Sequence, residues 1–180
     1  MAVDELVRQA MAKWPHVPAC FGWLALDRRG QWWMRDDRVQ SLGAFQSGKP
    51  GAKGSLLRHE KLIDFIGRNY ANDEQGRWYF QNGPQRVFVE LESTPYVWRL
   101  DADFTPRAHT GQTTQVLACH VDEQGHVYLQ TSLGFGLVHS LDVGLVADAV
   151  EQGIWQPDDC LANALPSRFG FVLSPQAQQG

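Results

Sequence analysis

Two arginines in matching sequence contexts are the residues of this chain best suited to hold a ligand. Arg86 and Arg168 each stand two residues after a proline, and each begins an apolar segment. A guanidinium grips a carboxylate or phosphate through paired hydrogen bonds, and a tryptophan can supply a flat apolar wall beside it. Trp78 and Trp155 form a second matched pair, because each follows a Glu-Gln-Gly segment. The four residues predict a groove for a small anionic ligand between two related halves of the chain. The alternative is structural: each Trp anchors a helix end, and each Arg pairs with a carbonyl or carboxylate.

A second candidate is the Gly- and Lys-rich segment 48–55. A phosphate-binding P-loop needs GxxxxGK followed by Ser or Thr, whereas the order here is Lys-Gly-Ser. We expect Ser55 to cap a helix, whose N-terminal N–H groups would still favour an anion. The residues of this candidate are Lys49, Lys53, Gly54 and Ser55. The alternative is a solvated loop followed by an ordinary helix cap.

The cysteines and histidines form no recognisable catalytic or metal-binding motif. Zinc sites use short paired spacings, which are absent among the possible ligands Cys119, His120, His126, His139 and Cys160. No GxSxG or HExxH motif is present. A hairpin register that turns Cys119 inward would turn His120 and His126 to an outer face. We therefore expect no metal, no cofactor and no catalytic residue.

Composition restricts the class of protein. The chain has 180 residues, of which 43% are hydrophobic, and a formal net charge of -4, so it should fold without binding nucleic acid or anionic membrane surfaces. Its three cysteines form no close pair, and its start carries Asp4 and Glu5 rather than a signal peptide. The best apolar stretch, 127–138, is shorter than the roughly 20 residues of a membrane span. A soluble protein of the cytoplasm is expected.

The segment from Gly22 to Arg35 reads as a hairpin that turns at 27–30. Its register places Leu24, Leu26, Trp32 and Met34 on one face and Trp23, Ala25 and Trp33 on the other. Two exposed tryptophans on one sheet surface would need a cover. A second subunit could supply it, and so could a first helix with the apolar stripe Leu6, Val7, Ala10, Met11 and Trp14. Trp23 and Trp33 therefore predict an interface, and a homodimer is the expected assembly.

Short matches in the same order indicate an internal duplication. A second hairpin over 117–130 follows the first, Ser-Leu-Gly recurs at 41–43 and 132–134, and the Pro-x-Arg segments lead into apolar strands at 87–91 and 169–173. We expect one domain over 1–180, with repeats at about 18–92 and 114–175 and a connection at about 93–113. The fold class is α+β, with two ββαβ-type units, a largely antiparallel sheet and about three helices. Whether the halves share one sheet or pack as two remains open.

The Trp-rich D-x-x-G hairpin, the Ser-Leu-Gly segment and the closing P-S-R-F-x-F-V-L run resemble an uncharacterised proteobacterial family of unknown function. The resemblance covers most of the chain and implies no activity, cofactor or site residue. The leading hypothesis is a non-catalytic binding or assembly module. The alternative is a small ligand-binding protein or enzyme that uses the groove between the two halves.

Overall fold

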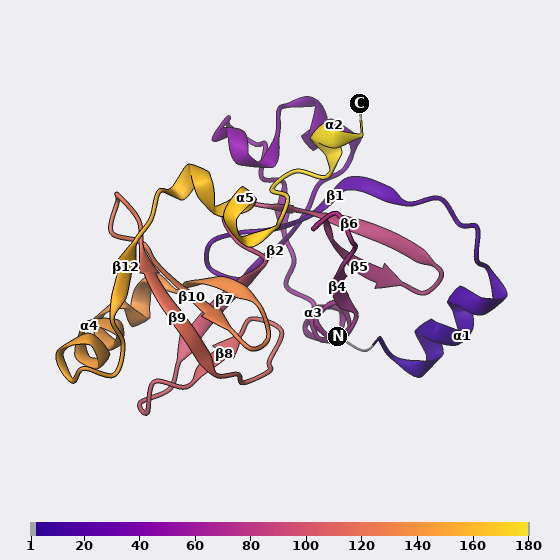
Figure 1. The fold of residues 1–180 in the computed structure, drawn as a ribbon. Coiled ribbons are helices and arrows are strands. Elements are labelled where there is room, and N and C mark those ends of the chain that lie inside the picture. Colours follow the sequence, from indigo (N-terminus) through magenta and orange to yellow (C-terminus); the bar gives the residue numbers. More distant parts are fainter. Residues whose placement is uncertain (1–2, 180) are drawn as a thin grey trace. The chain divides into compact units, whose positions relative to one another are not determined.

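A computed structural model describes residues 3–179 and divides them into two compact units (Figure 1). Unit 1 contains residues 3–27, 31–92 and 171–179, and unit 2 contains residues 28–30 and 93–170. Each unit is built around its own six-stranded mixed sheet. The fold is α+β with two similar halves, as the sequence predicts.

The sheet of unit 1 has the strand order β3-β2-β1-β6-β5-β4. Its β1–β6 pair is parallel, and its other neighbours are antiparallel. Helix α3 lies on the sheet, and its Phe65 ring meets Phe80 edge-on at 5.5 Å. The elements of this unit are α1 (Glu5–Lys13), β1 (Cys20–Leu26), β2 (Trp32–Met34), α2 (Asp37–Ser41), η1 (Phe45–Ser47), β3 (Ser55–Leu56), α3 (Glu60–Arg68), β4 (Tyr70–Asn72), β5 (Trp78–Asn82), β6 (Gln85–Leu91) and η4 (Gln176–Gln178).

The sheet of unit 2 has the strand order β12-β9-β10-β11-β7-β8. The β11–β7 and β12–β9 pairs are parallel, and the remaining neighbours are antiparallel. The elements are β7 (Tyr96–Leu100), β8 (Pro106–Ala108), β9 (Val116–Val121), β10 (Val127–Thr131), β11 (Phe135–Val138), η2 (Ser140–Asp142), α4 (Val143–Glu151), β12 (Pro157–Asp159), η3 (Ala162–Ala164) and α5 (Leu165–Phe169).

Five strands have the same connectivity and pairing in both units. The run β2-β1-β6-β5-β4 corresponds to β8-β7-β11-β10-β9, and in each run only the second and third strands are parallel. The register of the hairpins agrees as well. Leu24 pairs with Met34 in β1–β2, and Trp98 pairs with Ala108 at the equivalent position of β7–β8. The first hairpin therefore corresponds to β7–β8 in this five-strand alignment, and not to β9–β10, with which the sequence matches align it.

Both hairpin registers predicted from alternation are confirmed. Leu26 pairs with Trp32 in the first hairpin, and Cys119 pairs with Leu129 in the second. His120 lies on the face opposite Cys119, as the alternation predicts, but this face is covered at His120, which is buried against Phe135 and Phe169.

Two local predictions are wrong. The predicted strand at 169–173 is absent. Phe169 ends α5 (Leu165–Phe169), in which Pro166 suits the first turn, and Gly170 follows with φ +69°, outside the range of an extended strand. Ser55 caps no helix: it lies in β3, and α3 begins at Glu60, where the His59 imidazole accepts a hydrogen bond from the Leu62 N–H.

A buried charged pair fastens loops and the C-terminal tail to the sheet of unit 1. Arg35 is fully buried and donates to the carbonyl oxygens of Gly22, Gly43 and Ala52. Glu90 is also buried, and its carboxylate accepts hydrogen bonds from the Ser174 hydroxyl and a backbone N–H of the tail. Burial raises the pKa of Glu90, although these hydrogen bonds and Arg35 act in the opposite direction. The pair holds the segment 43–52 and residues 174–176 in place.

Within residues 3–179, no helix combines the length and the apolar character needed to cross a membrane.

Candidate functional site

The Arg86 side chain lies on β6 beside the adjacent strand β5. Its guanidinium carbon stands 4.0 Å from the centre of the Tyr79 ring, and both side chains are half-buried. Among the described residues, no carboxylate pairs with it. This contact with the tyrosine ring restrains the guanidinium and leaves its N–H groups to a ligand.

A cavity of about 350 Å³ opens beside Arg86, between helix α1 and the β5–β6 hairpin. Its apolar wall comes from α1 and the segment after it, with Met11, Trp14 and Val17. Figure 1 shows α1 on the side of the sheet where this hairpin ends. We call this cavity the α1 groove. The other residues that line it are Pro15, Ala19, Gln81, Pro84 and Arg86.

A second cavity, of about 440 Å³, borders Arg86 from another side. Tyr79 lines this cavity, together with the turn between β4 and β5, which includes Asp73 and Glu74. These carboxylates would repel an anion. Among the described residues that line the α1 groove, Arg86 is the single charged one. The α1 groove is therefore the more favourable of the two cavities for an anion that binds Arg86.

Trp14 is the aromatic residue of this site, and sequence reasoning missed it. Its ring is 51% exposed, and the Lys13 ammonium lies 4.7 Å from the ring centre. The helical spacing of Leu6, Val7 and Trp14 suggests a buried stripe, yet of these three only Val7 is buried. One sequence feature points to Trp14: it stands directly before Pro15, at the end of the helix, where a side chain is less completely buried than in the middle.

Of the four residues that the sequence pairs, Trp78 and Arg86 lie in unit 1, and Trp155 and Arg168 lie in unit 2. Trp78 is buried in β5 against Tyr70, whereas Trp155 follows α4 and lines a cavity of about 420 Å³ in unit 2. Arg168 is exposed on the short helix α5 of unit 2. The residue of unit 2 that is equivalent to Arg86 is Phe135 and not Arg168. Gln81 pairs with Arg86 in β5–β6, and Gln130 pairs with Phe135 in β10–β11. The groove between the two halves stays a prediction.

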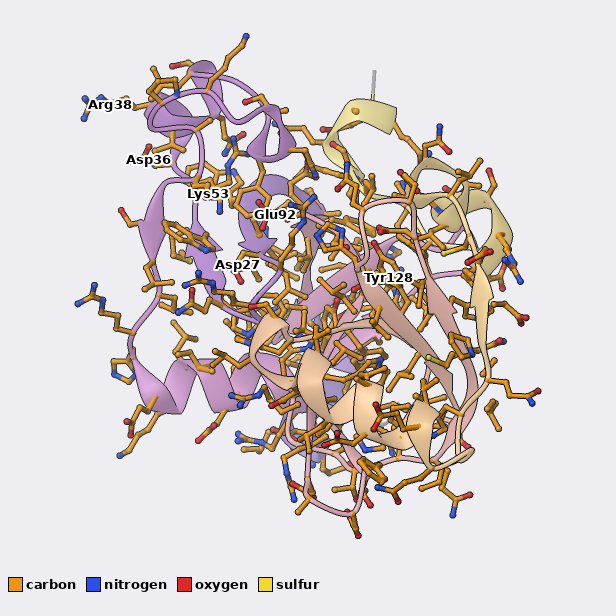
Figure 2. The ribbon with its side chains drawn as sticks, turned by 90° about the vertical axis from the view of Figure 1, so that its left-hand side faces the viewer. Asp27, Asp36, Arg38, Lys53, Glu92 and Tyr128 are labelled. Atoms are coloured by element: carbon orange, nitrogen blue, oxygen red, sulfur yellow. The ribbon has the colours of Figure 1, made fainter. Side chains whose placement is uncertain are left out.

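The predicted anion loop has a structural role in unit 1. The carbonyl oxygen of Ala52 accepts a hydrogen bond from the buried Arg35, and a carbonyl attracts cations rather than anions. Lys53 pairs with Glu92 at 3.4 Å (Figure 2). Its ammonium also lies 5.5 Å from the centre of the Trp33 ring. Gly54 has φ +94°, and an added Cβ would lie 2.2 Å from the Met34 carbonyl oxygen. Lys49 is exposed. Ser55 caps no helix, so the N–H groups of a helix N-terminus that were expected to favour an anion here are absent from this position. Anion binding by this loop stays a prediction.

Trp23 and Trp33 have different surroundings. Trp33 is half-buried and donates from Nε1 to the Asp27 carboxylate at 2.9 Å, and Figure 2 shows Asp27, Lys53 and Glu92 in this region. Trp23 is 38% exposed and lines an apolar cavity of about 240 Å³ together with Met34 and Leu62. Trp23 is therefore the better candidate for an interface residue.

Comparison with known proteins places the chain in a family. A family model described as "Protein of unknown function (DUF2946)" matches residues 3–176. The chain belongs to this family. The resemblance to a family of unknown function is thereby confirmed. A crystal structure of a DUF1285 family protein from Silicibacter pomeroyi is also similar, with 13% sequence identity, a TM-score of 0.47, and coverage of 82% of this chain and 85% of that chain. A comparison with curated proteins found no match.

The thiols and imidazoles of this DUF2946 family member are arranged without a metal cluster. Among the described residues, no group of three or more Cys, His, Asp and Glu side chains is placed to hold a metal ion. Burial raises the pKa of the Cys119 thiol to about 11 and also raises that of Cys20, which keeps both thiols protonated near neutral pH.

Proposed function

We propose that this chain is a non-catalytic binding module that holds an amphipathic anion in the α1 groove. The anionic group binds Arg86, and the apolar body rests on Met11, Trp14 and Val17. The observation that carries the proposal is the Arg86 guanidinium, which is half-buried, stacked on Tyr79 and without a carboxylate partner among the described residues.

The physical argument rests on an unused charge. A guanidinium that is partly removed from water gains from a carboxylate, which accepts two parallel hydrogen bonds from it. Stacking on Tyr79 orders the arginine before binding, so less side-chain entropy is lost when the ligand arrives. The alternative role for such an arginine is a structural ion pair, and Arg86 forms none with a carboxylate among residues 3–179.

The groove also sets the shape of the ligand. Its volume of about 350 Å³ lies at the lower end of the range of known small-molecule sites, and an aromatic and several apolar side chains face it. Apolar contact contributes about 25 cal/mol for each Å² removed from water. A small carboxylic acid with a compact apolar body suits both parts of the site.

The test is a titration of the whole protein, followed by NMR, with hexanoate and 3-phenylpropanoate and with the matched amides. We expect saturable binding of the acids and about ten- to hundredfold weaker binding of the amides, because a charge-assisted hydrogen bond is lost. Arg86→Gln should weaken binding of the acids to the level of the amides. Arg38→Gln, on the exposed face of α2, is the matched control and should leave binding unchanged. Equal binding of acids and amides, or an unaffected Arg86→Gln variant, would contradict the proposal.

We further propose that the protein works in the cytoplasm. In support, the three cysteines Cys20, Cys119 and Cys160 are free thiols. In cells lysed into acid to stop thiol exchange, all three should be alkylated without prior reduction. A disulfide in that sample would contradict a reducing location.

We also propose a homodimer, formed through the surface at the cavity that Trp23 and Met34 both border. In support, Trp23 and Met34 are 38% and 42% exposed, and both border the same apolar cavity. Exposed aromatic and thioether side chains at one apolar patch are typical of interfaces.

A further inference from the structure

We propose that the ligand of the α1 groove carries an aromatic ring, which stacks on the Arg86 guanidinium face that Tyr79 leaves uncovered, and a carboxylate that reaches the guanidinium edge. The inference rests on the proposed function and names the chemical class of its ligand. It comes from a comparison of equivalent positions in the two units.

The position of Arg86 in unit 1 is the position of Phe135 in unit 2. In β5 and β6, Tyr79 pairs with Phe88 and Gln81 pairs with Arg86. In β10 and β11, Tyr128 pairs with Leu137, and Gln130 pairs with Phe135. In each unit the tyrosine of the first strand stacks on the residue at this position of the second strand, Arg86 or Phe135.

Unit 2 fills the next layer of the stack with its own chain. Phe135 is parallel to Tyr128 at a ring separation of 5.6 Å, and it is also parallel to Phe169 at 3.9 Å. Phe169 belongs to α5, which lies outside the five strands that the units share. His120 meets Phe169 edge-on at 5.2 Å and completes an aromatic cluster.

Unit 1 leaves that layer open. Among the described residues, Tyr79 is the aromatic ring that stacks on Arg86, and no ring takes the place of Phe169. Arg86 lines both cavities, whereas Tyr79 lines the acidic cavity and not the α1 groove, and we therefore assign the uncovered face of the guanidinium to the groove. The open layer therefore coincides with the site that the proposed function assigns to the ligand.

Replacement of phenylalanine by arginine changes what this layer binds. Both side chains end in a flat, weakly hydrated group that stacks on a ring. Arginine adds N–H donors at the edge of its plane, which a phenylalanine lacks. A ligand with a ring and a carboxylate two or three bonds apart would use the face and the edge of Arg86 together.

Two sources supply this chemistry: a free aromatic acid, and a peptide that ends in an aromatic residue. In both, the ring and the carboxylate are separated by a short flexible linker. The experiment separates them by comparing 3-phenylpropanoate with the peptide Gly-Gly-Gly-Phe and its C-terminal amide.

The decisive comparison is between 3-phenylpropanoate and 3-cyclohexylpropanoate, which have similar size and the same charge but differ in flatness. We expect the aromatic acid to bind the whole protein about three- to thirtyfold more tightly in an NMR titration. Arg86→Lys keeps the charge and loses the flat face, so this preference should disappear while both acids still bind. Arg168→Lys, in unit 2, is the matched control and should keep the preference.

The outcomes distinguish the inference from the function. Equal affinities for the two acids in the wild-type protein would overturn the aromatic ligand and leave the proposed function standing. If neither acid binds the wild-type protein, the inference and the proposed function are both overturned. A preference for the aromatic acid that survives Arg86→Lys would also overturn the inference. Tighter binding of the peptide acid than of 3-phenylpropanoate would support the inference with a peptide C-terminus as the source, and binding of 3-phenylpropanoate alone would support it with a free acid.

Discussion

Asp73 and Asp122 occupy the same position in two copies of one turn. Each carboxylate accepts hydrogen bonds from the backbone N–H groups two and four residues later. Each also meets the side chain of the fourth residue, which is Arg77 in the first turn and His126 in the second. In both, burial raises the pKa of the carboxyl, but the hydrogen bonds outweigh it and lower the pKa below the usual value. The two turns are therefore held by the same interactions.

Asp122→Ala should destabilise the protein more than Asp73→Ala does. Asp122 also accepts from the Tyr128 hydroxyl at 2.8 Å, and its side chain is fully buried, so its loss leaves a buried hydroxyl without this acceptor. We expect a loss of about 2–4 kcal/mol for Asp122→Ala and a smaller loss for Asp73→Ala. Unfolding by urea measures both. Equal losses would show that the tyrosine contact adds no stability.

The contribution of Asp122 should depend on pH. Its pKa is lower in the folded protein than the ordinary 3.8, so the stabilisation is complete above that value and is lost as the pH falls through the folded-state pKa. The stability difference between the wild type and Asp122→Asn should therefore shrink when the pH is lowered from about 5 to about 2. A difference that stays constant with pH would contradict this linkage.

His120 should make unit 2 sensitive to acid. Its imidazole is buried, and neither ring nitrogen has a hydrogen-bond partner among the described residues. Burial lowers its pKa from 6.5, Arg168 lowers it further, and Asp158 acts in the opposite direction. Because the unfolded chain takes up the proton more readily, this group removes stability as the pH falls below about 6.5.

His120→Leu removes that proton uptake. The melting temperature of the variant relative to the wild type should rise as the pH is lowered from about 7 to about 5. His16→Leu, at an exposed position, is the control and should show no such trend. If the two variants respond alike to pH, His120 is not the sensitive group.

Gly54→Ala should be far more damaging than Gly48→Ala. Both glycines have positive φ, and that alone costs an L-residue about 1–2 kcal/mol. At Gly48 an added Cβ meets nothing within 4 Å, whereas at Gly54 it would lie 2.2 Å from the Met34 carbonyl oxygen. In denaturant unfolding, the losses of unfolding free energy in the two variants should differ by several times the loss caused by Gly48→Ala. Similar losses would mean that the close approach of Gly54 to β2 is easily relaxed.

The proposed dimer predicts the behaviour of one surface variant. Trp23→Ser should convert a dimer to a monomer in sedimentation equilibrium, because Trp23 is exposed and supplies apolar area to the interface. Trp14→Ser, which removes an exposed tryptophan from another surface of unit 1, is the control. A wild-type protein that sediments as a monomer at high concentration contradicts the dimer.

Alternation of apolar residues predicted the fold class and both hairpin registers, because each register is a local property of a strand pair. The alignment of the two halves could not be obtained in the same way. The Glu-Gln-Gly segment at 74–76 was matched to 151–153, which lies at the end of α4. The longer match is Asp-Glu-Gln-Gly at 73–76 and 122–125, followed in both places by a tyrosine and a glutamine in step. Hairpin turns of this kind resemble one another in many proteins, so the sequence alone does not single out these two as copies of one turn.

The sequence identifies Arg86 as a ligand-binding candidate, but the aromatic residue that shares a cavity with Arg86 is Trp14. Trp78 was attractive because it lies near Arg86 along the chain, but strand alternation directs it into the core. Trp14 reaches the groove only through the packing of α1 beside the hairpin, a long-range contact that no local pattern encodes. The correspondence of Arg86 with Phe135 likewise depends on strand pairing.

A crystal structure of the protein soaked with 3-phenylpropanoate tests the central claim most directly. We predict the phenyl ring parallel to the Arg86 guanidinium on the face opposite Tyr79, with the carboxylate accepting hydrogen bonds from the guanidinium and Met11 and Trp14 in contact with the ligand. A carboxylate of the protein itself paired with Arg86, or the acid bound elsewhere while the α1 groove stays empty, would contradict the account.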